Sequence, residues 1–153
     1  MRRSDRKNAT PDLGVSAGRL LFAVQDELFT RLAEEGHAEL RPQHGVVLGY
    51  LDPEGSRATD LAQRSGQHKQ VIGKMVDELE ALGYVERRPD PYDRRAKLVV
   101  PTARGLDQMT RSDAVVEALE RRHAEAVGEE AYAEFRRVLR EVTELQRAWR
   151  EQG

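Results

Sequence analysis

The sequence contains no cysteine and few aromatic residues, and both shortages exclude classes of protein. Without cysteine there is no disulfide framework, no thiol nucleophile and no cysteine-based zinc site. Aromatic residues make up 5% of the chain and charged residues 34%, a balance typical of exposed amphipathic helices rather than of a large aromatic-lined pocket. The length of 153 residues predicts one domain of ordinary size, or one compact module with helical extensions, and the lack of cysteine favours a reducing cytoplasm.

Long apolar runs and the short motifs of common enzymes are also absent. No stretch of about 18 apolar residues could cross a membrane, and the basic start MRRSDRKNATPDLG lacks the apolar core of a secretion signal. The chain has no nucleophile-elbow, phosphate-loop, zinc-protease or dinucleotide-binding motif, and its histidines lie far apart in sequence. We therefore expect no enzyme, no cofactor, no metal site and a cytoplasmic location.

Positive charge is concentrated in one part of the chain, although the net charge is only −2. Arginines and lysines gather between residues 64 and 111, and glutamates lie on both sides of this stretch. The basic residues are Arg64, Lys69, Lys74, Arg87, Arg88, Arg94, Arg95, Lys97, Arg104 and Arg111. A basic patch on an acidic body suits phosphate binding, because only the face that meets DNA must be positive. The alternative is a solvated surface of fluctuating charge.

Apolar residues spaced three and four apart predict helices along most of the chain. The predicted helices cover residues 13–33, 42–51, 58–64, 68–82, 102–126 and 129–151. Between the fourth and the fifth, YVERR and KLVV alternate with a period of two, which predicts an antiparallel strand pair at 84–88 and 97–100. Only the first ten or so residues and the last two are expected to be untethered. The predicted fold class is mainly α with a small β-hairpin.

Residues 58–82 have the proportions of a helix-turn-helix. Ala62 is small where two helices must cross closely, Gly66 stands where the turn needs a positive φ, and Ile72 packs between the helices. The second helix starts with long polar side chains, as a recognition helix does where it meets base edges and phosphates. Its inward face is predicted to consist of Val71, Ile72, Met75, Val76, Leu79 and Leu82. A purely structural helical corner is the alternative.

The polar face of this second helix supplies the first group of candidate DNA contacts. They are Gln67, His68, Lys69, Gln70, Gly73 and Lys74. Gly73 is unusual because glycine in a helix interior costs roughly 1 kcal/mol relative to alanine. On an exposed face, its missing side chain would let the helix approach DNA closely; a merely tolerated glycine is the other interpretation.

The loop PDPYDRRAKL, residues 89–98, joins the two predicted strands and is too long for a tight hairpin. Arginine side chains suit the narrow minor groove, so Arg94 and Arg95 are the candidate contacts there. Asp93 is expected to orient one of these arginines by a charge-assisted hydrogen bond. The loop is therefore interpreted as a wing beside the recognition helix, and a solvent-exposed polar hairpin is the alternative.

The stretch from Leu40 to Gly105 resembles the winged helix-turn-helix of the MarR family of bacterial transcription regulators. The segments that carry the resemblance are LRPQHGVVLGYL, ATDLAQRSG, VDELEALGYVERRPDPYDRRAKLVV and PTARG. The chain departs from the family pattern at Pro101, where leucine is usual, and at Gly73, where a small polar residue is common. The resemblance predicts a winged helix-turn-helix DNA-binding lobe at 40–101 and dimerisation helices at 11–39 and 102–151.

The resemblance also implies a homodimer that binds a pseudo-palindromic operator in double-stranded DNA, and a small molecule that releases the dimer. A narrow apolar stripe on the last helix favours the dimer, because it is too apolar to stay in water, and we expect it to be buried against the helix at 13–33 and a second subunit. The stripe contains Tyr132, Phe135, Val138, Leu139, Val142, Leu145 and Trp149. Candidate ligand contacts are Phe22, Phe29, His44 and Tyr50, each of which could be ordinary core.

The predicted function is a sequence-specific DNA-binding regulator, most simply a repressor. The alternative is a helical protein–protein interaction module whose last helix binds a partner and whose basic loop is incidental. Retention on immobilised DNA that is lost with added salt distinguishes the two, because phosphate contacts are salt-labile.

Overall fold

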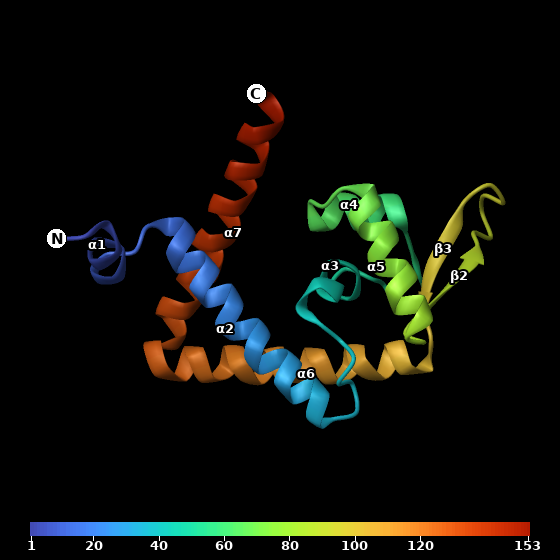
Figure 1. Cartoon of the computed structure of the whole chain (residues 1–153), viewed down its shortest axis with the longest axis horizontal. Coiled ribbons are helices and arrows are strands. Elements are labelled where there is room, and N and C mark those ends of the chain that lie inside the picture. Colours follow the sequence, from blue (N-terminus) through green and yellow to red (C-terminus); the bar gives the residue numbers. More distant parts are fainter. The chain divides into compact units, whose positions relative to one another are not determined.

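The computed structural model describes residues 1–153, which divide into two compact units, Met1–Asp113 and Ala114–Gly153 (Figure 1). The elements of the first unit are α1 (Arg3–Ala9), α2 (Leu13–Glu34), the 3₁₀ turn η1 (Pro42–His44), α3 (Gly45–Leu48), β1 (Ser56–Arg57), α4 (Ala58–Ser65), α5 (Lys69–Ala81), β2 (Val85–Pro89), β3 (Lys97–Pro101) and the start of α6 (Ala103–Val127). The second unit contains the rest of α6 and α7 (Glu129–Gln152).

The mainly α fold with a small wing is confirmed, and most helix ends lie within one or two residues of the prediction. Two differences concern short elements. Residues 3–9 form a helix where an untethered end was expected; its Asp5 side chain accepts a hydrogen bond from the Arg2 amide at 3.1 Å. The predicted helix at 42–51 is instead a 3₁₀ turn followed by a single α-helical turn, which ends before Gly49.

The sheet has three strands rather than the predicted pair, in the order β1-β3-β2. The two-residue strand β1 pairs antiparallel with β3, so that Ser56 lies opposite Val99 and Arg57 opposite Leu98. Strand β2 pairs with the other edge of β3. Because β1 leads directly into α4, the short strand ties the wing to the start of the helix-turn-helix.

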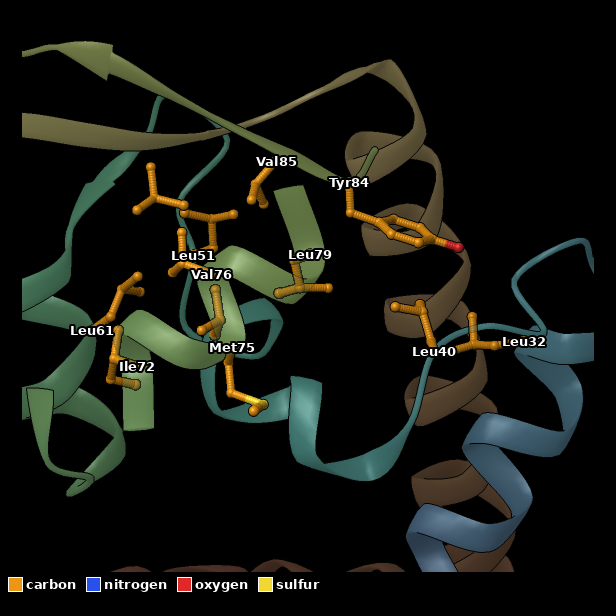
Figure 2. Packing of buried hydrophobic residues seen from close by; sticks show 12 residues of the cluster. Leu32, Leu40, Leu51, Leu61, Ile72, Met75, Val76, Leu79, Tyr84 and Val85 are labelled. Carbon is orange, nitrogen blue, oxygen red and sulfur yellow. The ribbon is translucent and has the colours of Figure 1, made fainter. Parts of the chain in front are cut away.

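The core of the first unit lies between α3, α4, α5 and the base of the wing, and it includes Leu32 of α2 and Leu40, as Figure 2 shows. Leu61 of α4, Leu79 of α5 and Tyr84 just before β2 are completely buried. Two glycines with positive φ follow the helices of the helix-turn-helix, Gly66 after α4, as predicted, and Gly83 after α5. Gly105 of α6 lies so close to the Tyr84 carbonyl that a β-carbon at this position would overlap it.

Several large apolar side chains of α2 and α7 are exposed in the single chain. On α2 only Leu32 is buried, whereas Leu20, Leu21 and Phe22 are exposed. Helix α7 has no buried residue, and its stripe is at least 40% exposed from Phe135 to Trp149. The predicted burial of this stripe would therefore require a second chain.

The second unit is a helical hairpin held together where α6 meets α7. Gly128 separates the two helices with a φ of 99°. The Tyr132 hydroxyl donates a hydrogen bond to the Glu120 carboxylate at 3.1 Å, and Arg136 pairs with the same carboxylate. None of the helices in either unit is long and apolar enough to span a lipid bilayer.

Candidate nucleic-acid interface

The helix-turn-helix predicted at 58–82 is formed by α4 and α5. Gly66 adopts the left-handed conformation in the turn, with a φ of 72°, while Leu61 and Ile72 are fully buried between the helices. Ala62 packs partly buried against the same core. Ala62 and Ile72 therefore pack as the spacing predicted, and Gly66 has the backbone conformation that the turn was predicted to need.

The polar start of α5 is exposed, as a recognition helix requires. Gln67, His68, Lys69 and Gln70 are all exposed, and His68 is the N-cap residue, with its backbone extended. Lys74 lies one turn further along and is also exposed. One residue of the predicted inward face is misplaced: Val71 is 39% exposed, because the buried stripe of α5 consists of Ile72, Met75, Val76 and Leu79.

Gly73 lies beside this polar face without a structural reason for being glycine. A β-carbon at this position would meet no atom within 4 Å, and the backbone is ordinary α-helix. Close packing inside the chain therefore does not require the missing side chain. The remaining explanations are a close approach to something outside the chain, or tolerance of glycine.

Gly73→Ala separates these explanations. Both predict a more stable chain, but only a close approach to DNA predicts weaker DNA binding. Thermal unfolding should show a gain of up to about 1 kcal/mol, since alanine is the better helix former and has room here. If α5 approaches DNA closely, titration of a bound duplex should show weaker binding by the stabilised variant. Unchanged binding would mean that the glycine is merely tolerated.

The wing candidates Arg94 and Arg95 are exposed on the loop between β2 and β3. The predicted contact of Asp93 with an arginine side chain is wrong: its carboxylate accepts a hydrogen bond from the Arg95 backbone N–H at 3.0 Å. The Asp93 carbonyl accepts a second from the Ala96 amide. Asp93 thus shapes the turn at the wing tip, and a different acid of the loop, Asp90, binds an arginine.

The fold sorts the basic residues between 64 and 111 into two groups. One group forms ion pairs inside the chain, so its charge is already balanced. These pairs are Arg64 with Asp52, Arg87 with Asp77 and Glu80, Arg88 with Glu86, Arg104 with Glu39, and Arg111 with Glu35 and Asp107. The other group forms no ion pair and lies on α5 and the wing: Lys69, Lys74, Arg94, Arg95 and Lys97. Among the basic residues between 64 and 111, those without an ion pair therefore lie on α5 and the wing.

The four candidate ligand contacts differ in their surroundings. Phe22 and Tyr50 are exposed, and Phe29 packs against the core. His44 is buried and has internal partners on both ring nitrogens, the Arg41 amide at 3.0 Å and the Glu78 carboxylate at 3.0 Å. The His44 side chain therefore connects η1 to α5.

A shallow hollow lies at the other end of the first unit, between α1 and the start of α2. Its lining includes Arg3, Arg6, Lys7 and Asp12, and none of the four candidate ligand contacts.

A buried polar network around His37, which no sequence motif indicated, joins three segments of the first unit. The Asp107 carboxylate accepts a hydrogen bond from His37 Nε2 at 2.8 Å, and the Tyr84 hydroxyl lies 2.8 Å from His37 Nδ1. The His37 hydrogen bond is the main reason why the pKa of Asp107 lies below its usual value. Arg104 stacks on the Tyr84 ring, 4.3 Å from its centre. The network connects the loop after α2 with α6 and the base of the wing.

Comparison with known proteins shows what the helix-turn-helix and the wing are similar to. Residues 38–96 match the model of the MarR family. The solved structure of CouR from Rhodococcus jostii RHA1 bound to p-coumaroyl-CoA is 29% identical, covers 86% of this chain and 91% of its own, and has a TM-score of 0.70. A MarR-family transcriptional regulator from Rhodococcus sp. RHA1 is 28% identical, covers 93% of this chain and 95% of its own, and has a TM-score of 0.67.

A further neighbour is a complex with nucleic acid. The transcriptional repressor CouR bound to a 23-mer DNA duplex is 25% identical, covers 90% of this chain and 96% of its own, and has a TM-score of 0.71. No curated protein matches the sequence significantly. Residues 38–96, which hold the helix-turn-helix and most of the wing, thus match the MarR family of transcription regulators, and the neighbours that cover most of the chain share its winged helix-turn-helix fold.

Proposed function

We propose that the protein is a homodimeric repressor that binds a pseudo-palindromic operator and is released from it by a small molecule. Residues 40–101 form the DNA-binding lobe, and the helices at 11–39 and 102–151 form the dimer. In each subunit α5 enters the major groove, where Gln67, His68, Lys69 and Gln70 reach base edges and phosphates. The wing lies along the adjacent minor groove with Arg94 or Arg95 inserted.

The observation that carries this proposal is the cluster of exposed basic residues without ion pairs on α5 and the wing. The arginines that are paired with acids would bring little net attraction to DNA. Lys69, Lys74, Arg94, Arg95 and Lys97 are exposed and form no ion pair, so they are the cations that the helix-turn-helix and the wing can offer to phosphates. A net charge of −2 does not oppose this role, because the rest of the body carries the acids.

Dimer formation is supported by the exposed apolar side chains of α2 and α7. Several such side chains on each helix are 40% exposed or more in the single chain. Monomeric proteins rarely leave contiguous patches of this kind in water. A two-fold dimer would also place two copies of α5 about one helical turn of DNA apart, as a pseudo-palindromic operator requires.

Release by a small molecule is supported by the solved complex of CouR with p-coumaroyl-CoA. A ligand can release the dimer from DNA only if it binds one dimer conformation more tightly than another. The favoured conformation must be one in which the spacing of the two lobes does not fit DNA. The p-coumaroyl-CoA thioester itself is the first compound to test. Phe22, Phe29 and Tyr50 remain candidate contacts, whereas the internal hydrogen bonds of His44 favour a structural role.

The direct test is selection of duplexes from a random-sequence library by the purified protein, followed by titration at two salt concentrations. Enrichment of a two-fold symmetric motif, with affinity that falls as salt rises, would support the proposal. Flow-through from immobilised DNA at low salt would overturn it and would favour the helical interaction module instead.

Arg95→Ala tests the wing arginines. We expect binding to the selected duplex and to random DNA to weaken together, because minor-groove insertion reads groove width and charge more than base identity. The slope of log affinity against log salt should flatten by about one unit for each phosphate that a subunit no longer neutralises. Arg88→Ala is the matched control, since Arg88 already pairs with Glu86 and should contribute less. Equal effects of the two variants would contradict the assignment of Arg95.

A further inference from the structure

Asp90 is a buried carboxylate at the base of the wing loop, directly after β2. It is only 4% exposed, although its neighbours from Pro91 to Arg95 are all exposed. One oxygen accepts a hydrogen bond from the Tyr92 backbone N–H at 2.8 Å; the other accepts from Arg57 Nε at 2.8 Å and lies 2.6 Å from an Arg57 terminal nitrogen. The Tyr92 amide and the Arg57 guanidinium hold the pKa of Asp90 below its usual range.

Arg57 belongs to a different part of the fold from the loop it binds. It is the second residue of β1 and the N-cap residue of α4, the first helix of the helix-turn-helix. Its side chain is about 41% exposed, so one side of the guanidinium faces solvent while the other contacts Asp90. The pair therefore joins the wing loop to the residue at which the helix-turn-helix begins.

The wing tip beyond Asp90 is closed by bonds within the loop. The Asp90 amide donates to the Ala96 carbonyl at 3.0 Å, and the Ala96 amide donates to the Asp93 carbonyl at 3.0 Å. Among the hydrogen bonds and ion pairs of residues 90–96, only the one between Arg57 and Asp90 reaches outside the wing. The tip is thus a closed loop that one side-chain interaction, between Asp90 and Arg57, connects to the helix-turn-helix.

We infer that the Arg57–Asp90 pair is a positioning device for DNA binding: it sets the place of Arg94 and Arg95 relative to the recognition helix α5. This inference rests on the proposed function. Neither residue of the pair needs to touch a base, because the pair acts by holding the tip at one distance from the helix-turn-helix. A charge-assisted pair with a buried carboxylate suits this role, since it is stronger and more directional than an exposed ion pair.

Asp90→Asn tests the inference, because simple charge counting and positioning predict opposite results. Removing an acid near DNA should tighten binding by charge alone. Asparagine can still accept the Tyr92 N–H but binds Arg57 weakly, so loss of positioning should instead weaken binding to the selected duplex by about tenfold. Glu86→Gln is the matched control: it removes the same charge from the same wing at an exposed pair, and it should bind as tightly as the unmodified protein or more tightly.

Two further measurements distinguish positioning from general damage to the fold. Hydroxyl-radical footprints of Asp90→Asn should lose protection of the flanking minor grooves while protection of the central major groove persists. In a background that lacks both wing arginines (Arg94→Ala and Arg95→Ala), Asp90→Asn should have little further effect, because the pair acts through these arginines. Arg57→Lys, which keeps the charge but cannot form the same two contacts, should give the same footprint if Asp90→Asn folds poorly.

The outcomes are separable from those of the proposed function. If the unmodified protein selects a duplex but Asp90→Asn binds it equally or more tightly, the positioning role of the Arg57–Asp90 pair is overturned. The proposed function as a DNA-binding repressor is then unaffected. Parallel loss of flanking and central protection, or full additivity with the combined Arg94→Ala and Arg95→Ala changes, would also overturn the positioning role. If the unmodified protein selects no duplex at all, the proposed function fails and this inference fails with it.

Discussion

Leu139→Glu is expected to convert the protein from a dimer to a monomer and to abolish specific DNA binding. Leu139 is 43% exposed on α7, in the apolar stripe that has no buried residue in the single chain. A buried charge without a partner in the dimer interface would cost several kcal/mol, whereas the same charge in the monomer would stay in water. A monomer holds only one half-site, so the gain from binding two half-sites at once is lost.

Sedimentation at micromolar concentration, together with titration of the selected duplex, measures both effects. Arg140→Glu is the matched control, because Arg140 is the next residue on the same helix, lies on the polar side and receives the same side chain. The control should remain dimeric. Helical content should be unchanged in Leu139→Glu, since the leucine is exposed in the single chain. A monomeric unmodified protein, or a dimer of Leu139→Glu, would contradict the assignment of α7 to the interface.

Gln70→Ala is expected to relax base preference at one position in each half-site. Gln70 is exposed in the first turn of α5, where a recognition helix meets base edges. Glutamine binds adenine through two hydrogen bonds, and such a pair discriminates against other bases by about 1 to 3 kcal/mol. Repeating the duplex selection with the variant should therefore give a motif degenerate at two symmetry-related positions, with half-site centres roughly 10 base pairs apart.

Lys74→Ala provides the contrast for Gln70→Ala. Lys74 lies one turn later on the exposed side of α5 and is a point charge suited to phosphate. Its loss should weaken binding to all duplexes and flatten the salt dependence, but leave the selected motif unchanged. If Gln70→Ala behaves like Lys74→Ala, Gln70 contacts phosphate and the base assignment is wrong.

The elements that the sequence predicts well are those with local causes. Apolar periodicity places the long helices, and glycines that must adopt positive φ mark the ends of α4 and α5. Helix α1 and strand β1 have no such periodic signature, because the six polar residues and one alanine of α1 form no apolar stripe and the two residues of β1 show no alternation. Strand β1 depends on its pairing with β3, a segment about 40 residues later in the sequence.

By itself, the amino-acid sequence determined the mainly α fold, the helix-turn-helix, the position of the wing and the polar start of α5. Only the tertiary structure decided which basic residues are free to meet phosphate, and which acid of the wing holds an arginine. From the sequence we predicted that Asp93 binds the side chain of Arg94 or Arg95. In the fold, the acid that binds an arginine side chain is Asp90, and its partner is Arg57, which lies 33 residues earlier. The reason is physical: an ion pair forms between groups that folding brings together in space, and neighbours in sequence often point apart.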